Sequence, residues 1–271
     1  MTRGVFSDLN VQRLESRAAN LALLQTLADS GYERVAICHH VTLKRGVQLK
    51  AAPDVTELVE RTPATKRGRQ LEVLQRLTVM VDDPALLHTL SSPAAESYDL
   101  LAVCPASDRV FLQACSVLPI DIVTFNFAEK LPFVLKFSQL SQAVERGLSL
   151  EICYSPALRG SSGRRNTLSN AQELVKGCRG KGVLVSSGGE RALDFRPPLD
   201  IVNMSRLFGL TDIQCKAAIT TVGRAALLHS RMRRHSAKAV VSSHPLPAGR
   251  RKREREQDSE TSVKKLRKDD S

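Results

Sequence analysis

The sequence lacks several features that define common protein classes. It has no tryptophan, and only 4% of its residues are aromatic. Because these do not alternate with basic residues, we do not expect a protein that binds single strands by stacking bases on aromatic side chains. No run approaches the roughly 20 apolar residues of a membrane span, and the first residues lack the apolar stretch of a signal peptide. We therefore predict a soluble, intracellular protein without membrane association.

Enzyme motifs are also missing. The sequence has no nucleophile elbow, Walker phosphate loop or H-E-x-x-H motif, and no glycine-rich dinucleotide fingerprint follows its first predicted strand. Its six cysteines are scattered singly without a C-x-x-C pair, which is typical of reduced thiols in a core. The sequence thus identifies no catalytic residue, no metal site and no cofactor of its own.

Positive charge is abundant and unevenly distributed. The 271 residues carry a formal net charge of +12, and residues 231–271 hold 13 Lys and Arg against 6 Asp and Glu. A balance of this kind indicates a polyanionic partner, above all a nucleic acid. Apolar periodicity fades beyond His235, so we predict a disordered basic tail over residues 236–271. Two basic clusters in this tail are typical of nuclear localisation signals, with candidate residues Arg250, Arg251, Lys252, Arg253, Lys264 and Lys265.

The remaining chain, residues 1–235, alternates between strand-like and helix-like patterns. Such alternation predicts parallel strands joined by crossover helices. With seven expected strands and no dinucleotide fingerprint, we predict an α/β TIM-like barrel rather than an open doubly wound sheet. The expected strands are residues 5–9, 34–38, 71–81, 98–104, 120–125, 148–154 and 182–186. The expected helices are residues 11–30, 84–90, 107–117, 138–146, 168–178, 199–209, 212–218 and 223–233.

Polar residues follow several predicted strands, where barrel enzymes place their active sites. Asp8, His39 and His40 are the candidates for a metal site, and in outline the chain resembles the polymerase and histidinol phosphatase superfamily. That superfamily begins with His-x-His and ends with Asp-x-His, whereas this chain has Asp-Leu-Asn at 8–10 and Ser-Gly-Gly at 187–189. Adjacent histidines without carboxylate partners make a poor metal site. We favour a structural role for them, with a metal-dependent phosphoesterase as the alternative.

The turn at residues 186–191 has two interpretations. Free backbone N–H groups around Gly188 and Gly189 can form an anion-binding nest, with Arg191 adding a bidentate donor for an RNA phosphate. A plain strand-to-helix turn that needs glycine for a positive φ is equally compatible. Glu190 is an equally plausible ion-pair partner for Arg191.

Other basic residues occupy unusual positions. Arg164 and Arg165 follow a glycine- and serine-rich segment that we expect to be a flexible loop before a helix, and Lys130 lies in a loop that Pro132 fixes. Arg76 interrupts a strand-like run and Arg224 an otherwise apolar helix, so each needs a carboxylate or phosphate partner, with ion pairing as the default. The candidate RNA-binding residues are Arg76, Lys130, Arg164, Arg165, Arg191 and Arg224.

Several blocks together resemble one family. They are VFSDL at 5–9, EKLPF at 129–133, SSGGER at 186–191, LFGL at 207–210 and GRAALLH at 223–229. From Val5 to about Arg231 the chain resembles the thirty-kilodalton protein subunit of eukaryotic ribonuclease P and ribonuclease MRP. The likeness ends in the tail and is weakest over residues 43–70.

The resemblance implies a barrel-fold, non-catalytic subunit of the ribonucleoprotein that removes the 5′ leader of precursor tRNA, and of a sister particle that processes precursor rRNA. It implies that the RNA subunit carries the Mg²⁺-dependent chemistry, so that this chain needs no cofactor. The implied partners are the ribonuclease P and MRP RNAs, other protein subunits including small α/β proteins, and, indirectly, precursor tRNA. The implied location is the nucleus and nucleolus. A nuclear adaptor without RNA contact is a third possibility.

Overall fold

Seven parallel strands form one sheet in the order β1 to β7. The structure is a computed structural model that describes residues 4–235. Each strand hydrogen-bonds to the next one in the sequence, which is the topology of a TIM-like barrel. The strands are β1 (Ser7–Gln12), β2 (Arg34–Thr42), β3 (Glu72–Val81), β4 (Leu100–Pro105), β5 (Ile122–Val123), β6 (Ser149–Cys153) and β7 (Val183–Ser186).

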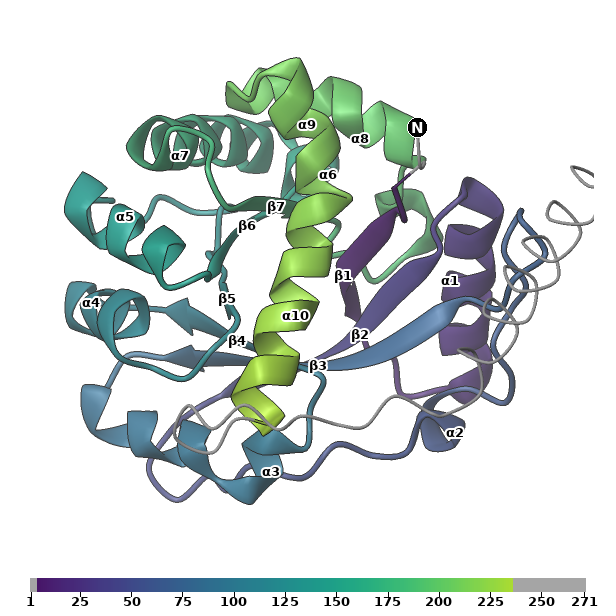
Figure 1. The fold of residues 1–271 in the computed structure, drawn as a ribbon, viewed down its shortest axis with the longest axis horizontal. Helices are drawn as coiled ribbons and strands as arrows, with labels where there is room; N and C mark the ends of the chain where they lie inside the picture. Colours follow the sequence, from purple (N-terminus) through teal and green to yellow (C-terminus); the bar gives the residue numbers. More distant parts are fainter. Residues whose placement is uncertain (1–3, 236–271) are drawn as a thin grey trace, which may run out of the picture. The chain divides into compact units, whose positions relative to one another are not determined.

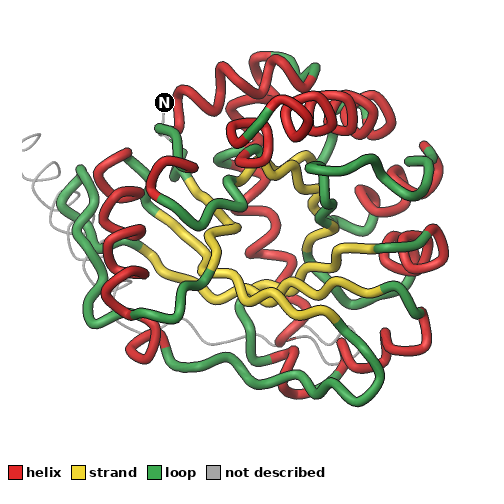
Figure 2. Tube along the Cα trace, turned by 180° about the vertical axis from the view of Figure 1, so that it is seen from behind, coloured by secondary structure: helices red, strands yellow, loops and turns green. Residues whose placement is uncertain are grey.

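The sheet curls into a nearly closed barrel (Figures 1 and 2). β1 meets the segment that follows β7, where the Gln12 N–H donates to the Gly189 carbonyl at 2.9 Å and the Gly188 N–H donates to the Asn10 carbonyl at 2.8 Å. The pairing register of β1 on β2 shifts between Asp8 and Val11. Such a bulge bends a strand locally, and here it lies beside the seam.

Helices cover the outside of the barrel, as Figure 1 shows for α1, α4, α5 and α7. Most of them connect consecutive strands, as the alternating sequence pattern predicts. They are α1 (Arg17–Ser30), α2 (Val55–Leu58), η1 (Pro84–Ser91), α3 (Pro93–Glu96), α4 (Asp108–Ser116), α5 (Phe137–Glu145), α6 (Ser155–Arg159), α7 (Ser161–Cys178), η2 (Ala192–Asp194), α8 (Pro198–Ser205), η3 (Arg206–Phe208), α9 (Asp212–Ala218) and α10 (Thr221–His235).

Helix α10 lies across the N-terminal opening of the barrel, in front of the strands in Figure 1. Its Ala226 and Leu227 pack on an apolar cluster that includes Leu9 and Ala36 from inside the barrel. Gly223 permits this approach, because a Cβ there would lie 2.5 Å from the Ser7 hydroxyl oxygen. One end of the barrel is therefore sealed, and only the C-terminal end is left for a ligand. Within residues 4–235 no helix is long and apolar enough to span a bilayer.

The prediction of a TIM-like barrel is confirmed, and each expected strand overlaps an observed one. Several boundaries were wrong, and β2, for example, continues to Thr42 instead of ending at Cys38. β1 extends to Gln12, and the first helix begins only at Arg17 after an N-cap at Ser16, because Val11 continues the strand rather than the apolar face of the helix. Helix α7 begins at Ser161 instead of residue 168. The predicted tail and its nuclear localisation residues lie outside the described residues.

Candidate nucleic-acid interface

A buried ion pair occupies the centre of the barrel. Arg76 on β3 and Glu151 on β6 are both 0% exposed, and two guanidinium nitrogens lie 2.5 and 2.6 Å from the two carboxylate oxygens. Glu151 also accepts hydrogen bonds from the Ser186 hydroxyl at 2.5 Å and the Asn10 amide at 3.1 Å. Arg76 donates in addition to the Leu9 carbonyl at 2.9 Å. Charges removed from water in this way require complete pairing, and here both have it.

The pairing keeps both groups charged. The charge and hydrogen bonds of Arg76 hold the pKa of Glu151 below its usual range despite the opposing effect of burial. Burial works against the charge of Arg76, but the attraction of Glu151 outweighs it and raises the pKa of the guanidinium. The candidacy of Arg76 for RNA binding is therefore wrong, because the side chain cannot reach a partner outside the barrel. The alternative interpretation, structural ion pairing, is confirmed.

Asp8, His39 and His40 do not converge on a metal position. The Asp8 carboxylate accepts from the backbone N–H groups of Ser187 and Asn10 at 3.1 and 3.2 Å. The His39 and His40 rings instead pair with Arg13 and Gln12 on the neighbouring strand end. Among residues 4–235 no three His, Cys, Asp or Glu side chains are placed to share a metal ion. The donor set therefore does not fit the metal cluster of a phosphoesterase, and no observation favours that alternative.

Asp8 gives stability an unusual pH dependence. Burial raises the pKa of its carboxyl to about 6 from an ordinary value near 3.8, although the bonds from Ser187 and Asn10 lower it. Because the folded state favours the protonated form, the contribution of Asp8 to stability is fully present below about pH 4 and is lost as the pH rises through about 6.

We expect Asp8→Asn to make the protein more stable at pH 8, by about 1–2 kcal/mol, since the amide keeps the acceptor oxygen and carries no charge. The gain should vanish near pH 4. Urea unfolding of both proteins from pH 4 to pH 8 measures it, with the exposed Asp82→Asn as control. A difference between Asp8→Asn and the parent that does not change with pH would contradict this assignment.

The turn at residues 187–191 does not offer free N–H groups. The Ser187 N–H donates to Asp8 and the Gly188 N–H to the Asn10 carbonyl, while those of Glu190 and Arg191 both donate to the Asp194 carboxylate at 3.2 Å. The predicted anion-binding nest is therefore wrong, because a carboxylate of the chain already fills it. The plain turn is confirmed, with Gly188 at φ 61°.

The charges around this turn are also paired differently from the prediction. Glu190 pairs with Arg159 at 3.3 Å and not with Arg191. Arg159 and Arg191 both approach Asp194, at 2.7 and 3.6 Å. The Arg191 side chain is 63% exposed, so this longer pair leaves its guanidinium accessible from solvent. Arg191 stays a candidate for RNA contact.

Lys130 and Arg165 lie together, although 35 positions separate them in the sequence. Both line a groove of about 450 Å³ between the loop after β5 and helix α7. Arg164 and Arg165 belong to the first turns of α7 and are exposed, so the flexible loop expected before them is wrong. The Arg164 Nε–H donates to the Ala157 carbonyl at 3.1 Å. None of the side chains of Lys130, Arg164 and Arg165 forms an ion pair with any described residue.

The loop that carries Lys130 is held in place, as predicted. Amide groups of α7 donate to its carbonyls, from Asn166 to Ala128 at 2.9 Å and from Asn170 to Glu129 at 2.7 Å. The ring of Phe133 stacks on Phe111 with 5.0 Å between centroids, so this residue packs onto the barrel body. The groove is therefore preformed, with its cations on a fixed framework.

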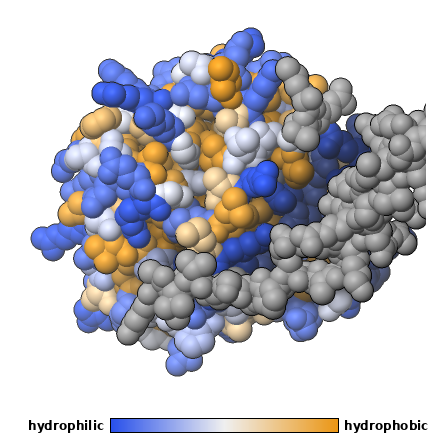
Figure 3. All heavy atoms as spheres, in the orientation of Figure 1, coloured by the Kyte–Doolittle hydropathy of each residue, from blue (hydrophilic) through white to orange (hydrophobic). Residues whose placement is uncertain are grey.

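Arg224 lies apart from these residues. It is exposed on α10, at the opposite end of the barrel, and the expected ion pair is absent among residues 4–235. Figure 3 shows that this face mixes apolar and charged side chains. Leu228 and Met232 on the same helix are 50% and 66% exposed. The structure thus places Lys130, Arg164, Arg165 and Arg191 towards the open end and Arg224 at the sealed end.

Sequence reasoning missed Arg13, which immediately follows β1 at the open end. The expected strand ended at Leu9, so attention fell on Asp8, which is buried. Once β1 is extended to Gln12, the rule that functional groups follow barrel strands selects Arg13 directly.

These features define the class of the protein as a nearly closed α/β barrel with a neutralised interior and accessible cations around its open end. The chain belongs to the ribonuclease P subunit p30 family, whose sequence model matches residues 5–235.

Related proteins match this chain over nearly all of its length. The chain is 38% identical over 246 residues to ribonuclease P protein subunit p30 of Mus musculus, covering 89% of this chain and 91% of that protein. It is 29% identical to ribonuclease P/MRP protein subunit RPP1 of Saccharomyces cerevisiae, covering 86% and 83%. A chain in the cryo-EM structure of archaeal ribonuclease P with mature tRNA has the same fold, with a TM-score of 0.62 and 12% identity over 88% of this chain and 98% of that one.

Proposed function

We propose that this chain is a non-catalytic protein subunit of the ribonuclease P ribonucleoprotein, which removes the 5′ leader from precursor tRNA, and of ribonuclease MRP, which processes precursor rRNA. The single observation that carries the proposal is the family match over residues 5–235, supported by relatives that carry these names over most of their length. The protein stabilises the folded RNA subunit, and the RNA performs the Mg²⁺-dependent cleavage. No cofactor is assigned to the chain.

The surface charges support contact with RNA. Lys130 and Arg165 lie in one groove and Arg164 and Arg191 are exposed on the same half of the barrel, so phosphates can approach all four. Contacts of this kind position an RNA backbone without reading its sequence. The centre of the barrel is filled by the paired side chains of Arg76 and Glu151, which suits a structural role for the interior.

Assembly partners follow from the same proposal. They are the RNAs of the two particles and their other protein subunits, including small α/β proteins, with precursor tRNA reached indirectly. The particles place the protein in the nucleus and nucleolus, where the predicted basic tail would direct it.

The test is purification of the tagged full chain from nuclear extract, followed by sequencing of the RNA that accompanies it. We expect one abundant structured RNA and an eluate that cleaves the 5′ leader of a precursor tRNA, with activity lost after nuclease treatment. Recovery of protein partners without a specific RNA would point to the nuclear adaptor instead. Phosphoesterase activity of the RNA-free chain that a chelator abolishes would revive the metal-dependent alternative.

A further inference from the structure

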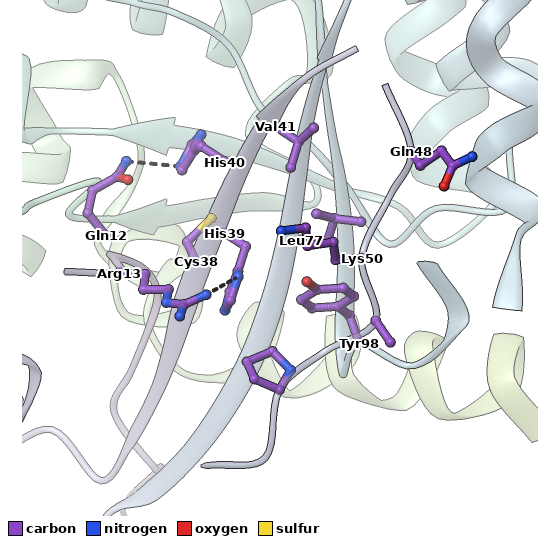
Figure 4. Close-up of a pocket in the computed structure, with 12 residues that line it drawn as sticks. Gln12, Arg13, Cys38, His39, His40, Val41, Gln48, Lys50, Leu77 and Tyr98 are labelled. Atoms are coloured by element: carbon purple, nitrogen blue, oxygen red, sulfur yellow. Dashed lines mark hydrogen bonds between the residues drawn. The ribbon is translucent and has the colours of Figure 1, made fainter. Parts of the chain in front are cut away.

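A second cavity, of about 580 Å³, opens at the same end of the barrel. One wall is formed by the ends of β1 and β2, and the other by the extended segment around residues 48–53 (Figure 4). Its volume falls within the range of roughly 300–1,000 Å³ that small-molecule sites occupy. The residues that line it are Gln12, Arg13, Cys38, His39, His40, Val41, Gln48, Lys50, Ala51, Pro53, Leu77 and Tyr98.

The charge of this cavity has one sign. Arg13 and Lys50 are its charged side chains, and its lining contains no carboxylate. Both cations are exposed, and neither forms an ion pair with a residue in the range 4–235. Lys50 extends from its loop towards the strand that carries His39 (Figure 4). A concave site with two unneutralised cations concentrates anions, and phosphates in particular.

His39 positions one of these cations. An Arg13 guanidinium nitrogen lies 3.2 Å from the His39 Nδ1 atom, so Nδ1 accepts and the neutral ring carries its hydrogen on Nε2. Burial first, and the charge of Arg13 second, lower the pKa of His39 to about 4, which keeps the ring neutral at physiological pH. The buried Nε2 atom has no hydrogen-bond partner in the described structure. A buried polar group without a partner is uncommon in folded proteins, and a bound ligand is one way to supply that partner.

The floor of the cavity is apolar. The Tyr98 ring packs edge-on against His39 with 5.4 Å between centroids, and Leu77 and Pro53 complete this surface. Tyr98 and Leu77 are only 2% and 1% exposed, so the partly exposed His39 ring is the part of the floor that a base can contact, next to the two cations that can bind a phosphate. Gln12 and Gln48 add amide groups that can hydrogen-bond to a base edge or a sugar.

We propose that this cavity holds one nucleotide of an RNA strand, with its phosphate between Arg13 and Lys50 and its base beside the His39 ring. The inference rests on the proposed function, since it assumes that the chain works in a ribonucleoprotein. It adds to that function a specific binding position, separate from the groove of Lys130 and Arg165. An RNA strand is favoured over a free nucleotide because other accessible cations lie at the same end of the barrel.

The first test measures binding of a labelled ten-nucleotide RNA to the full chain. We expect Arg13→Gln/Lys50→Gln to weaken binding about tenfold, because two phosphate contacts are lost. The matched control is Arg61→Gln/Lys66→Gln, which removes two exposed cations of the neighbouring segment that do not line the cavity and should change binding less than about twofold. Equal effects of the two double variants would overturn the proposal, and so would competition by adenosine monophosphate as strong as that by the RNA.

The second test locates the contact in the assembled particle. Ultraviolet cross-linking of the purified complex followed by mass spectrometry should yield a nucleotide adduct on a peptide that contains Arg13 or His39. If the chain recovers the ribonuclease P RNA but no adduct forms on these peptides, the cavity assignment fails while the proposed function stands. If no specific RNA is recovered, the proposed function itself fails.

Discussion

Replacing Glu151 by glutamine is expected to lower the free energy of unfolding by about 3–5 kcal/mol. The change leaves the guanidinium of Arg76 fully buried without a counter-charge. Urea unfolding of the full chain at pH 7.5 measures the loss. Arg206→Ala is the control, because its pair with Asp212 is 2.9 Å long but exposed, and such surface pairs contribute only about 0–1 kcal/mol.

The effects of substituting Arg76 and Glu151 on the free energy of unfolding are also expected to be strongly coupled. Arg76→Met alone should be similarly destabilising, because it leaves the Glu151 carboxylate buried and without its cation. The double variant Arg76→Met/Glu151→Gln should lose at least about 1 kcal/mol less than the sum of the two single losses, since it leaves no isolated charge. Additive losses would show that the two residues act independently and would contradict the role given to the ion pair.

Reversing the charges of the groove is expected to give the largest effect on RNA retention. Lys130→Glu/Arg165→Glu should weaken retention of the ribonuclease P RNA by the tagged chain about tenfold or more at moderate salt, because two cations become two anions beside a phosphate backbone. Both residues are exposed, so the melting temperature should change little. RNA retained over a series of salt concentrations is the readout.

The matched control for this experiment lies at the sealed end of the barrel. Arg224→Glu/Arg231→Glu on α10 makes the same change in net charge on exposed residues. We expect it to retain RNA within about twofold of the parent chain. Equal losses from the two double variants would show that net charge alone governs binding, and the groove would lose its assigned role.

The alternation of apolar runs predicted the barrel because the periodicity of strands and helices depends only on residues that are close in the sequence. Each buried parallel strand is a short apolar run, and each crossover helix shows the helical period, so both can be recognised within a few residues, as for the strand at 71–81 and the helix at 107–117. Gly209 ends its helical segment at φ 90°, and Thr211 forms a capping box with Gln214. The boundary after β1 was missed because Val11 fits a strand and an amphipathic helix equally well.

The site could not be predicted to the same extent, since its contacts join residues far apart in the chain. The charge of Arg76 indicated that this residue needs a partner. The sequence could not identify Glu151 as that partner, because 75 positions separate the two residues. The turn at 187–191 had the composition of an anion nest. Asp194, only three or four positions away, occupies the N–H groups of Glu190 and Arg191 locally, whereas Asp8 reaches the Ser187 N–H only because the barrel closes. The residues Lys130 and Arg165 form one groove only because the loop after β5 packs against α7.

The sequence by itself determined the alternation of strands and helices, the barrel class, the family and the basic character of the protein, because apolar periodicity, motif blocks and charge are properties of neighbouring residues. The tertiary structure decided which charges are available to a partner. Arg76 is buried inside the barrel, and Arg13 and Lys50 line one cavity. The accessible candidates are Lys130, Arg164, Arg165 and Arg191. Burial and pairing depend on distant segments that meet only when the barrel closes.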